Sequence, residues 1–104
     1  MQTIIVKLDS NKLENPDLDI LTYLPVRVEE ITDNKAYDNG YDYIDNDVIA
    51  VWLETEDAKG YAQKVIELMK SEKFCDNDLS QSAEVYISEE DCAELDNCEK
   101  VYPL

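Results

Sequence analysis

Histidine is absent from this 104-residue chain, and glycine occurs only at Gly40 and Gly60. Without histidine there is no Ser–His or Cys–His nucleophile pair and no ordinary proton shuttle near neutral pH. Two isolated glycines exclude a glycine-rich loop that cradles phosphate. Carboxylate pairs can act as acid and base, but among 25 Asp and Glu residues no pair stands out. We therefore expect no catalytic residues and no enzymatic activity.

Cysteine is scarce too, with Cys75, Cys92 and Cys98 and no Cys-x-x-Cys spacing. A structural zinc site needs four cysteine or histidine ligands, which makes one improbable here. The runs at 45–47 and 76–78 alternate Asp and Asn, but they lack the spacing, glycine and closing glutamate of an EF-hand loop. We expect no metal and no cofactor. The cysteines are typical of partly buried small side chains in a reducing compartment.

Basic residues are few: nine Lys and Arg face 25 acids, giving a net charge of −16. Such a field repels nucleic acid and anionic lipid, and it attracts a basic protein surface. The alternative is that the charge only keeps the protein soluble. We expect a basic protein partner, with no direct nucleic-acid contact and no membrane contact.

The charge is also segregated, because the stretches 36–58 and 74–99 contain no Lys or Arg. Segregation favours a patch over a uniform coat. Tyrosine beside aspartate suits a protein interface, which favours Tyr37 and Tyr41 as contacts, whereas Tyr43 is more typical of a sheet-filling residue. Trp52 is expected in the core. The predicted partner-binding residues are Tyr37, Asp38, Tyr41, Asp42, Asp45, Asp47, Glu54, Glu56 and Asp57, with a second candidate patch at Asp76, Asp78, Glu89, Glu90 and Asp91.

The length suits one domain, residues 1–104. The first apolar run follows Gln2 with no preceding basic region, so we expect no signal peptide, and no run is long enough to span a membrane. Cytoplasm is the expected location.

The first half of the chain predicts a strand at 2–8 and a helix with Asn15 as its N-cap and Pro16 in its first position. Pro25 leaves three possibilities, namely a kink, a second helix or a short strand at 26–29, and we favour helix. A polar loop is expected at 32–40. The segments 41–44 and 48–53 then flank a turn at 45–47, as in a β-hairpin. The second arm is apolar on both faces, as in a central strand covered on both sides.

The second half predicts a helix capped by Thr55, with an apolar stripe at Ala58, Tyr61, Ala62, Val65, Leu68 and Met69. A loop at 75–82 and a strand at 83–88 follow. Ser88–Asp91 resembles a capping box opening a short helix to about Asp96, and Val101–Tyr102 is expected to form an edge strand. This order predicts an α+β, ferredoxin-like split βαβ fold, with two helices on one face of an antiparallel sheet and a short C-terminal element.

The acidic stretches Asp38–Asp57 and Asp76–Glu99, in a small chain without catalytic residues, give it the character of a bacterial immunity protein. In size and acidity it resembles those of toxin–immunity systems, including contact-dependent growth inhibition. The resemblance implies a cognate toxin domain, such as a nuclease, whose positive surface the chain would occlude. Two alternatives stay open: a DNA mimic that blocks a nucleic-acid-binding protein, and a regulatory or assembly module whose acidity serves solubility.

Overall fold

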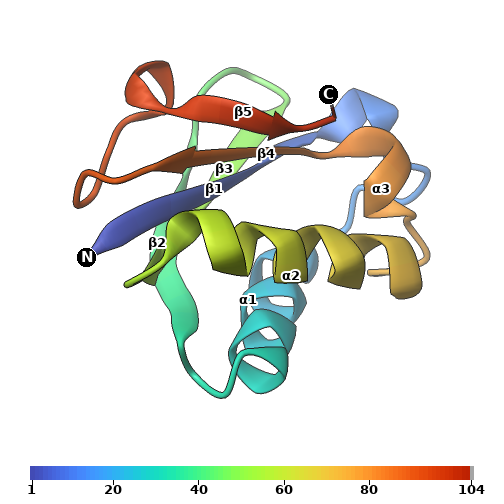
Figure 1. Ribbon diagram of the computed structural model, residues 1–104. Coiled ribbons are helices and arrows are strands. Elements are labelled where there is room, and N and C mark those ends of the chain that lie inside the picture. Colours follow the sequence, from blue (N-terminus) through green and yellow to red (C-terminus); the bar gives the residue numbers. More distant parts are fainter. Residues whose placement is uncertain (104) are drawn as a thin grey trace.

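The computed structural model describes residues 1–103 and shows an α+β fold built on one five-stranded antiparallel sheet (Figure 1). The strand order is β2-β3-β1-β4-β5. The predicted α+β class is therefore confirmed. The elements are β1 (Gln2–Asp9), η1 (Ser10–Lys12), α1 (Ile20–Ile31), β2 (Ala36–Tyr43), β3 (Val48–Thr55), α2 (Ala58–Ser71), α3 (Leu79–Ser82), β4 (Glu84–Ser88), η2 (Leu95–Asn97) and β5 (Glu99–Tyr102).

Strand β1 lies at the centre of the sheet, paired with β3 on one side and β4 on the other. Successive side chains of a strand point to opposite faces, so alternate β1 residues enter the core. Both α1 and α2 contribute to the same core cluster, through residues at helical spacing. Full burial of one such side chain contributes about 1.5–3 kcal/mol. The cluster includes Ile4, Val6 and Leu8 of β1, Val51 and Leu53 of β3, Leu24 and Val28 of α1, and Val65 and Met69 of α2.

Helix α1 begins at Ile20, so the predicted start with Asn15 as N-cap is wrong. The backbone of Asn15 is held elsewhere: its N–H donates to Oδ1 of the buried Asn77 (2.8 Å), and its carbonyl accepts from Asn77 Nδ2 (2.6 Å). The helix prediction across Pro25 is confirmed, because α1 runs through this buried proline to Ile31.

Strand β2 begins at Ala36, whereas a loop was predicted over 32–40. Pairing with β3 makes this polar segment a strand despite its weak intrinsic propensity. The register shifts between Asp38 and Tyr41, where Gly40 adopts φ 93°. At this bulge the Asp38 N–H donates to Glu29 Oε2 of α1 (3.1 Å), and the Gly40 N–H donates to Asp38 Oδ1 (2.9 Å). Two backbone N–H groups of this sheet edge thus donate to side-chain carboxylates.

Helix α2 matches the predicted stripe: Ala58, Ala62, Val65, Leu68 and Met69 are buried and Tyr61 is partly buried. Its N-cap is Asp57, and not Thr55 as predicted, because Asp57 Oδ1 accepts from the Gly60 N–H (3.1 Å). The predicted loop at 75–82 ends in the short helix α3, capped by Asp78 and anchored by the buried Leu79.

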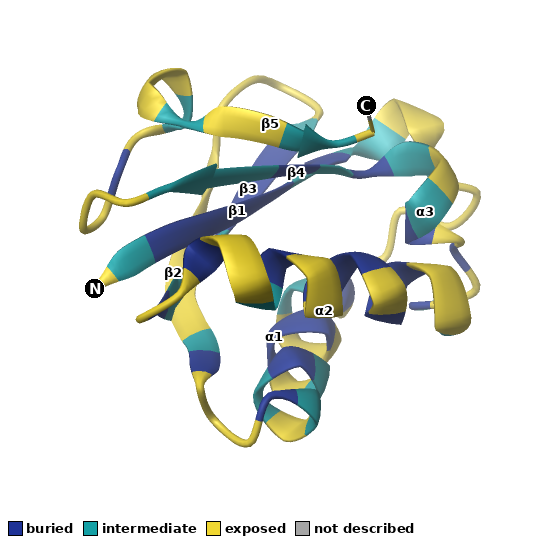
Figure 2. Cartoon of the chain, viewed as in Figure 1, coloured by how far each residue is buried: buried dark blue, intermediate teal, exposed yellow. Residues whose placement is uncertain are grey.

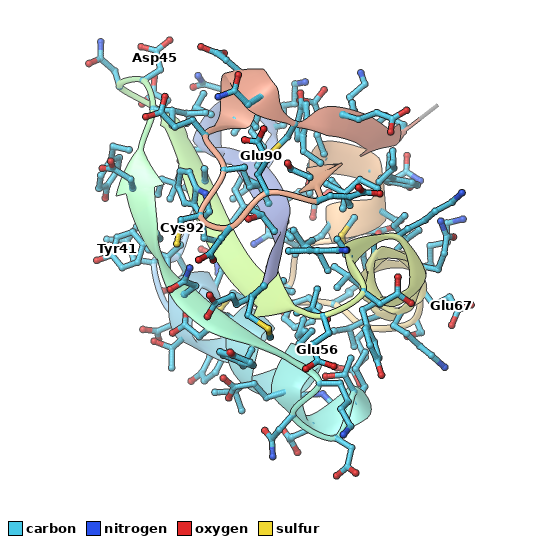
Figure 3. All side chains as sticks on the ribbon, turned by 60° about the vertical axis from the view of Figure 1, so that its left-hand side comes forward. Tyr41, Asp45, Glu56, Glu67, Glu90 and Cys92 are labelled. Carbon is cyan, nitrogen blue, oxygen red and sulfur yellow. The ribbon has the colours of Figure 1, made fainter. Side chains whose placement is uncertain are left out.

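Residues 89–98 connect β4 to β5, and we call them the crossing segment. No α-helix forms here, contrary to the predicted helix from Ser88, although the Ser88 hydroxyl accepts from the Glu90 N–H (3.0 Å) as a helix cap would. The Thr3 hydroxyl donates to the Glu90 carbonyl (2.8 Å) and accepts from the Ala93 N–H (3.2 Å). Trp52 Nε1 donates to the Ala93 carbonyl (2.8 Å). These bonds tie the crossing segment to β1 and β3, in front of the sheet in Figure 3.

The crossing segment therefore covers the face of the sheet opposite the core cluster, which we call the second face. Trp52 lies on this face and is only half-buried, so its predicted place in the core is wrong. The expectation that β3 is covered on both sides is confirmed, with the chain itself supplying the second cover. Within residues 1–103 no helix has the length and hydropathy for a membrane crossing.

Candidate protein-binding surface

The second face brings together acids from the two stretches that lack Lys and Arg. Asp42 of β2 is paired with Ala50 of β3, which puts its side chain on the same face as Trp52 and Glu54. Because the Trp52 indole bonds to Ala93, the crossing segment passes directly over these strands. We call the resulting surface the acidic face, made of Tyr37, Asp42, Trp52 and Glu54 from the sheet and Asp91, Glu94 and Asp96 from the crossing segment.

One end of the acidic face is a hollow of about 490 Å³. The charged side chains that line it are all acids, one from β2 and two from the crossing segment, and the other lining side chains are apolar. The hollow can therefore hold a group that is both cationic and apolar. Its lining residues are Asp42, Ile44, Trp52, Glu94, Leu95 and Asp96.

The other end of the acidic face gathers Tyr37, Glu54, Asp91 and Cys92. Burial, followed by the charge of Glu54 and a hydrogen bond to it, raises the pKa of Tyr37. The charges of Asp91 and Glu56 add to this rise in pKa. Glu54, Asp91 and Cys92 each place one ligand atom within 4.8 Å of the others, and Asn39 Nδ2 donates to Cys92 Sγ (3.6 Å). Two carboxylates and a thiol could hold a cation, although exposed acidic groups commonly gather without one.

Four further residues of the predicted first patch lie away from this surface. Asp38 accepts from the Gly40 N–H at the sheet edge, and Tyr41 is 56% exposed in the same strand. Asp45 and Asp47 lie in the hairpin turn, where Asp47 accepts from Asn11 Nδ2 (3.3 Å). Figure 3 shows Asp45 at the tip of this turn, well separated from Cys92. The predicted first patch thus divides between the acidic face, the edge of β2 and the hairpin tip.

The last two predicted residues, Glu56 and Asp57, precede α2 and are exposed. Glu56 lies close enough to Tyr37 for its charge to raise the pKa of that phenol, so it extends the acidic face. Asp57 caps the helix, which gives it a structural role independent of any partner.

The second predicted patch also divides. Glu89, Glu90 and Asp91 lie in the crossing segment and are exposed, and Asp91 joins the acidic face. Asp76 and Asp78 instead line a separate hollow of about 300 Å³, together with Lys12 and Lys73. The sequence thus contained no sign that residues 42–54 and 91–96 come together. It also suggested one patch of Asp76, Asp78 and residues 89–91, which the structure does not form.

Sequence reasoning missed Trp52, Ile44, Leu95, Glu94 and Asp96 as site residues. Glu94 and Asp96 both lie in the stretch 74–99, and its lack of Lys and Arg was the signal that could have identified them. Trp52 gave none, because a lone tryptophan in an apolar strand is usually core. Here the strand register puts Trp52 on the second face, and the crossing segment covers it only in part. Figure 2 shows how much of β2 and of the chain around β5 is exposed.

Two lysines on the second face, Lys7 and Lys100, share one acid beside the acidic face. Lys7 Nζ lies 3.4 Å from Glu84 Oε1, and Lys100 Nζ lies 3.6 Å from Glu84 Oε2. Burial disfavours the charged form of Glu84, but hydrogen bonds from Tyr86 and Lys7 and both lysine charges outweigh it, so its pKa is lowered. The hydrogen bond to Glu84 and, above all, burial raise the pKa of Tyr86 to about 12. Glu84 therefore stays ionised and holds both ammonium groups.

The cysteines differ in exposure. Cys75 and Cys98 are partly buried, as predicted, whereas Cys92 is exposed. Burial raises the pKa of Cys75 and of Cys98, and nearby acids raise both further, so both thiols stay protonated at neutral pH.

No family model, curated protein or solved structure matches the chain.

Proposed function

We propose that this protein is a non-catalytic inhibitor of the immunity type, which binds a basic partner such as a nuclease-type toxin domain and occludes its positive surface. The observation that carries the proposal is the meeting of two acidic stretches on one face, around a half-buried tryptophan. Distant segments are brought together there by hydrogen bonds within the fold, so the surface is formed before a partner arrives. Preformed surfaces bind with a smaller ordering cost.

The charge of this surface supports a basic protein as the partner. A net charge of −16 speeds encounter with a positive surface and repels phosphate backbones. Tyr37 and Trp52 add aromatic area, of the kind that contributes most to protein interfaces. A toxin whose positive groove normally holds phosphate would present such a complementary surface. A DNA-binding protein, the partner expected of a DNA mimic, is a second outcome of the same test.

We also propose the ferredoxin-like topology and a cytoplasmic location. The order β1-α1-β2-β3-α2-β4 and the arrangement β2-β3-β1-β4 support the split βαβ pattern, with β5 added at the edge. Both helices share one core cluster, and Arg27 Nε of α1 donates to Glu72 Oε2, just beyond α2 (3.0 Å). The partly buried free cysteines suit a reducing compartment.

The test is capture of the partner from the native host with the tagged full chain, followed by washes at low and at high salt. We expect one basic protein that is released by salt, and its nuclease activity should fall when the chain is added back in equal amount. Recovery of the chain alone, or of a neutral assembly, would overturn the proposal.

A pair of variants with equal charge change locates the contact. The first neutralises the hollow by Asp42→Asn, Glu94→Gln and Asp96→Asn. The second neutralises three exposed acids elsewhere by Glu14→Gln, Asp33→Asn and Glu67→Gln. We expect the first variant to bind the captured partner about tenfold or more weakly than the second, since the removed charges lie at the contact and not merely in the long-range field. Equal losses would place the contact off the acidic face.

A further inference from the structure

We infer that the hollow beside Trp52 accepts an arginine side chain from the basic partner. This inference rests on the proposed function and makes it specific, because it names the group that the surface recognises. The hollow, of about 490 Å³, is bounded by Asp42 and Ile44 at the end of β2, by Trp52 on β3, and by residues 94–96 of the crossing segment.

The lining of the hollow matches the two halves of an arginine side chain. Three apolar side chains, Trp52, Ile44 and Leu95, can cover its aliphatic stem. Three carboxylates, on Asp42, Glu94 and Asp96, can accept its N–H groups. None of these carboxylates has an ion-pair partner within the described residues, whereas Lys7 on the same face is held by Glu84.

The indole favours arginine over lysine. Trp52 Nε1 donates to the Ala93 carbonyl (2.8 Å), and this bond fixes the ring against the crossing segment. A planar guanidinium can stack on such a ring and bind carboxylates in a bidentate fork, whereas an ammonium is a compact, strongly hydrated charge. The site therefore selects the shape of the cation as well as its sign.

Two other hollows do not combine these features. The hollow near Asp76 and Asp78 is lined by three acids and by Lys12 and Lys73, so its own lysines offset most of its negative charge. A larger hollow of about 680 Å³, between the start of α2 and β5, contains Lys59 and no aromatic side chain. Only the hollow beside Trp52, among these three, joins an aromatic wall to uncompensated acids.

Trp52 also reports on its own site, because it is the only tryptophan in the chain. The probes are two pentapeptides with blocked ends, Gly-Arg-Gly-Arg-Gly and its lysine counterpart, added to the isolated full chain. Binding is followed by Trp52 fluorescence and by the NMR shift of the indole N–H. We expect the arginine peptide to shift both signals and to bind about threefold or more tightly than the lysine peptide, because stacking adds to charge.

The two triple variants described above are the controls. Neutralising Asp42, Glu94 and Asp96 should weaken binding of the arginine peptide about fivefold or more. Neutralising Glu14, Asp33 and Glu67 should weaken it less than about twofold. Equal binding of the two peptides, equal losses in the two variants, or an unmoved indole signal would each overturn the inference. The wild-type indole shift decides the question even if a variant fails to fold. If a partner is captured but the hollow shows no preference for arginine, the inference alone is overturned. If no partner is captured, the proposed function is overturned.

Discussion

At the scale of single residues, several predicted contact residues already have a task within the fold. Asp57 caps α2 through the Gly60 N–H, and a Cβ at Gly60 would lie 2.3 Å from Asp57 Oδ2. Glycine at this helix position therefore makes room for the cap, at the expense of helix propensity. An acid on an acidic protein is thus not by default a partner contact.

The cap gives a prediction for stability. Asp57→Ala should lower the free energy of unfolding by about 1 kcal/mol, because the Gly60 N–H loses its acceptor. Asp57→Asn keeps an oxygen at the same place and is the matched control, expected to lose only a few tenths of that amount. Urea denaturation followed by circular dichroism measures both. A loss in the Asn variant as large as in the Ala variant would mean that charge, and not the cap, stabilises the helix.

At the scale of elements, the apolar pattern predicted most of the fold, and local polar signals predicted less. The α2 stripe and the arm 48–53 carry periodicities that core burial enforces, so both predictions were confirmed. The start of β2 was wrong because pairing with β3 overrides weak propensity. The helix predicted at Ser88 was wrong because the Thr3 hydroxyl, far away in the sequence, holds both Glu90 and Ala93.

The candidate site was likewise predictable from the sequence only in part. Its charge was readable from the stretches 36–58 and 74–99, since no base interrupts either. Its composition was not readable, because the meeting of Asp42 with Glu94 depends on the route of the crossing segment. That route is fixed by hydrogen bonds between groups distant in the sequence, and one chain gives no signal for them.

The crossing segment can be tested through Thr3. Thr3→Val keeps the shape of the side chain and removes both hydrogen bonds, leaving the Ala93 N–H without its acceptor. We expect faster amide hydrogen exchange over residues 89–98 and a loss of about 1–3 kcal/mol in unfolding free energy. Thr3→Ser retains the hydroxyl and should exchange like the wild type in this segment. Unchanged exchange in the Val variant would show that other contacts hold the segment.

At the scale of the whole molecule, the charge has opposite effects on folding and on the proposed binding. A chain of net charge −16 repels itself when compact, and three of its acids line one hollow. Salt shortens the screening length from about 10 Å at 0.1 M to about 3 Å at 1 M. The same screening that relieves self-repulsion weakens attraction to a basic partner.

We therefore expect sodium chloride to raise the thermal unfolding midpoint between low and near-molar concentration. The variant Asp42→Asn, Glu94→Gln and Asp96→Asn loses three charges that line one hollow, so it should gain less from salt than the variant neutralised at Glu14, Asp33 and Glu67. Differential scanning calorimetry measures both midpoints. A midpoint that falls with salt, or an equal gain in the two variants, would show that the acidic face stores no repulsion.

The bulged edge of β2 has a consequence for how recognition can change over time. Because Glu29 occupies the Asp38 amide and Gly40 displaces the register, this edge offers a poor template for an added strand. A partner that docks at this edge would then recognise side chains, which can be exchanged one at a time without disturbing the backbone. On the proposed function, substitutions around the hollow would therefore change partner choice while the sheet beneath them stays the same.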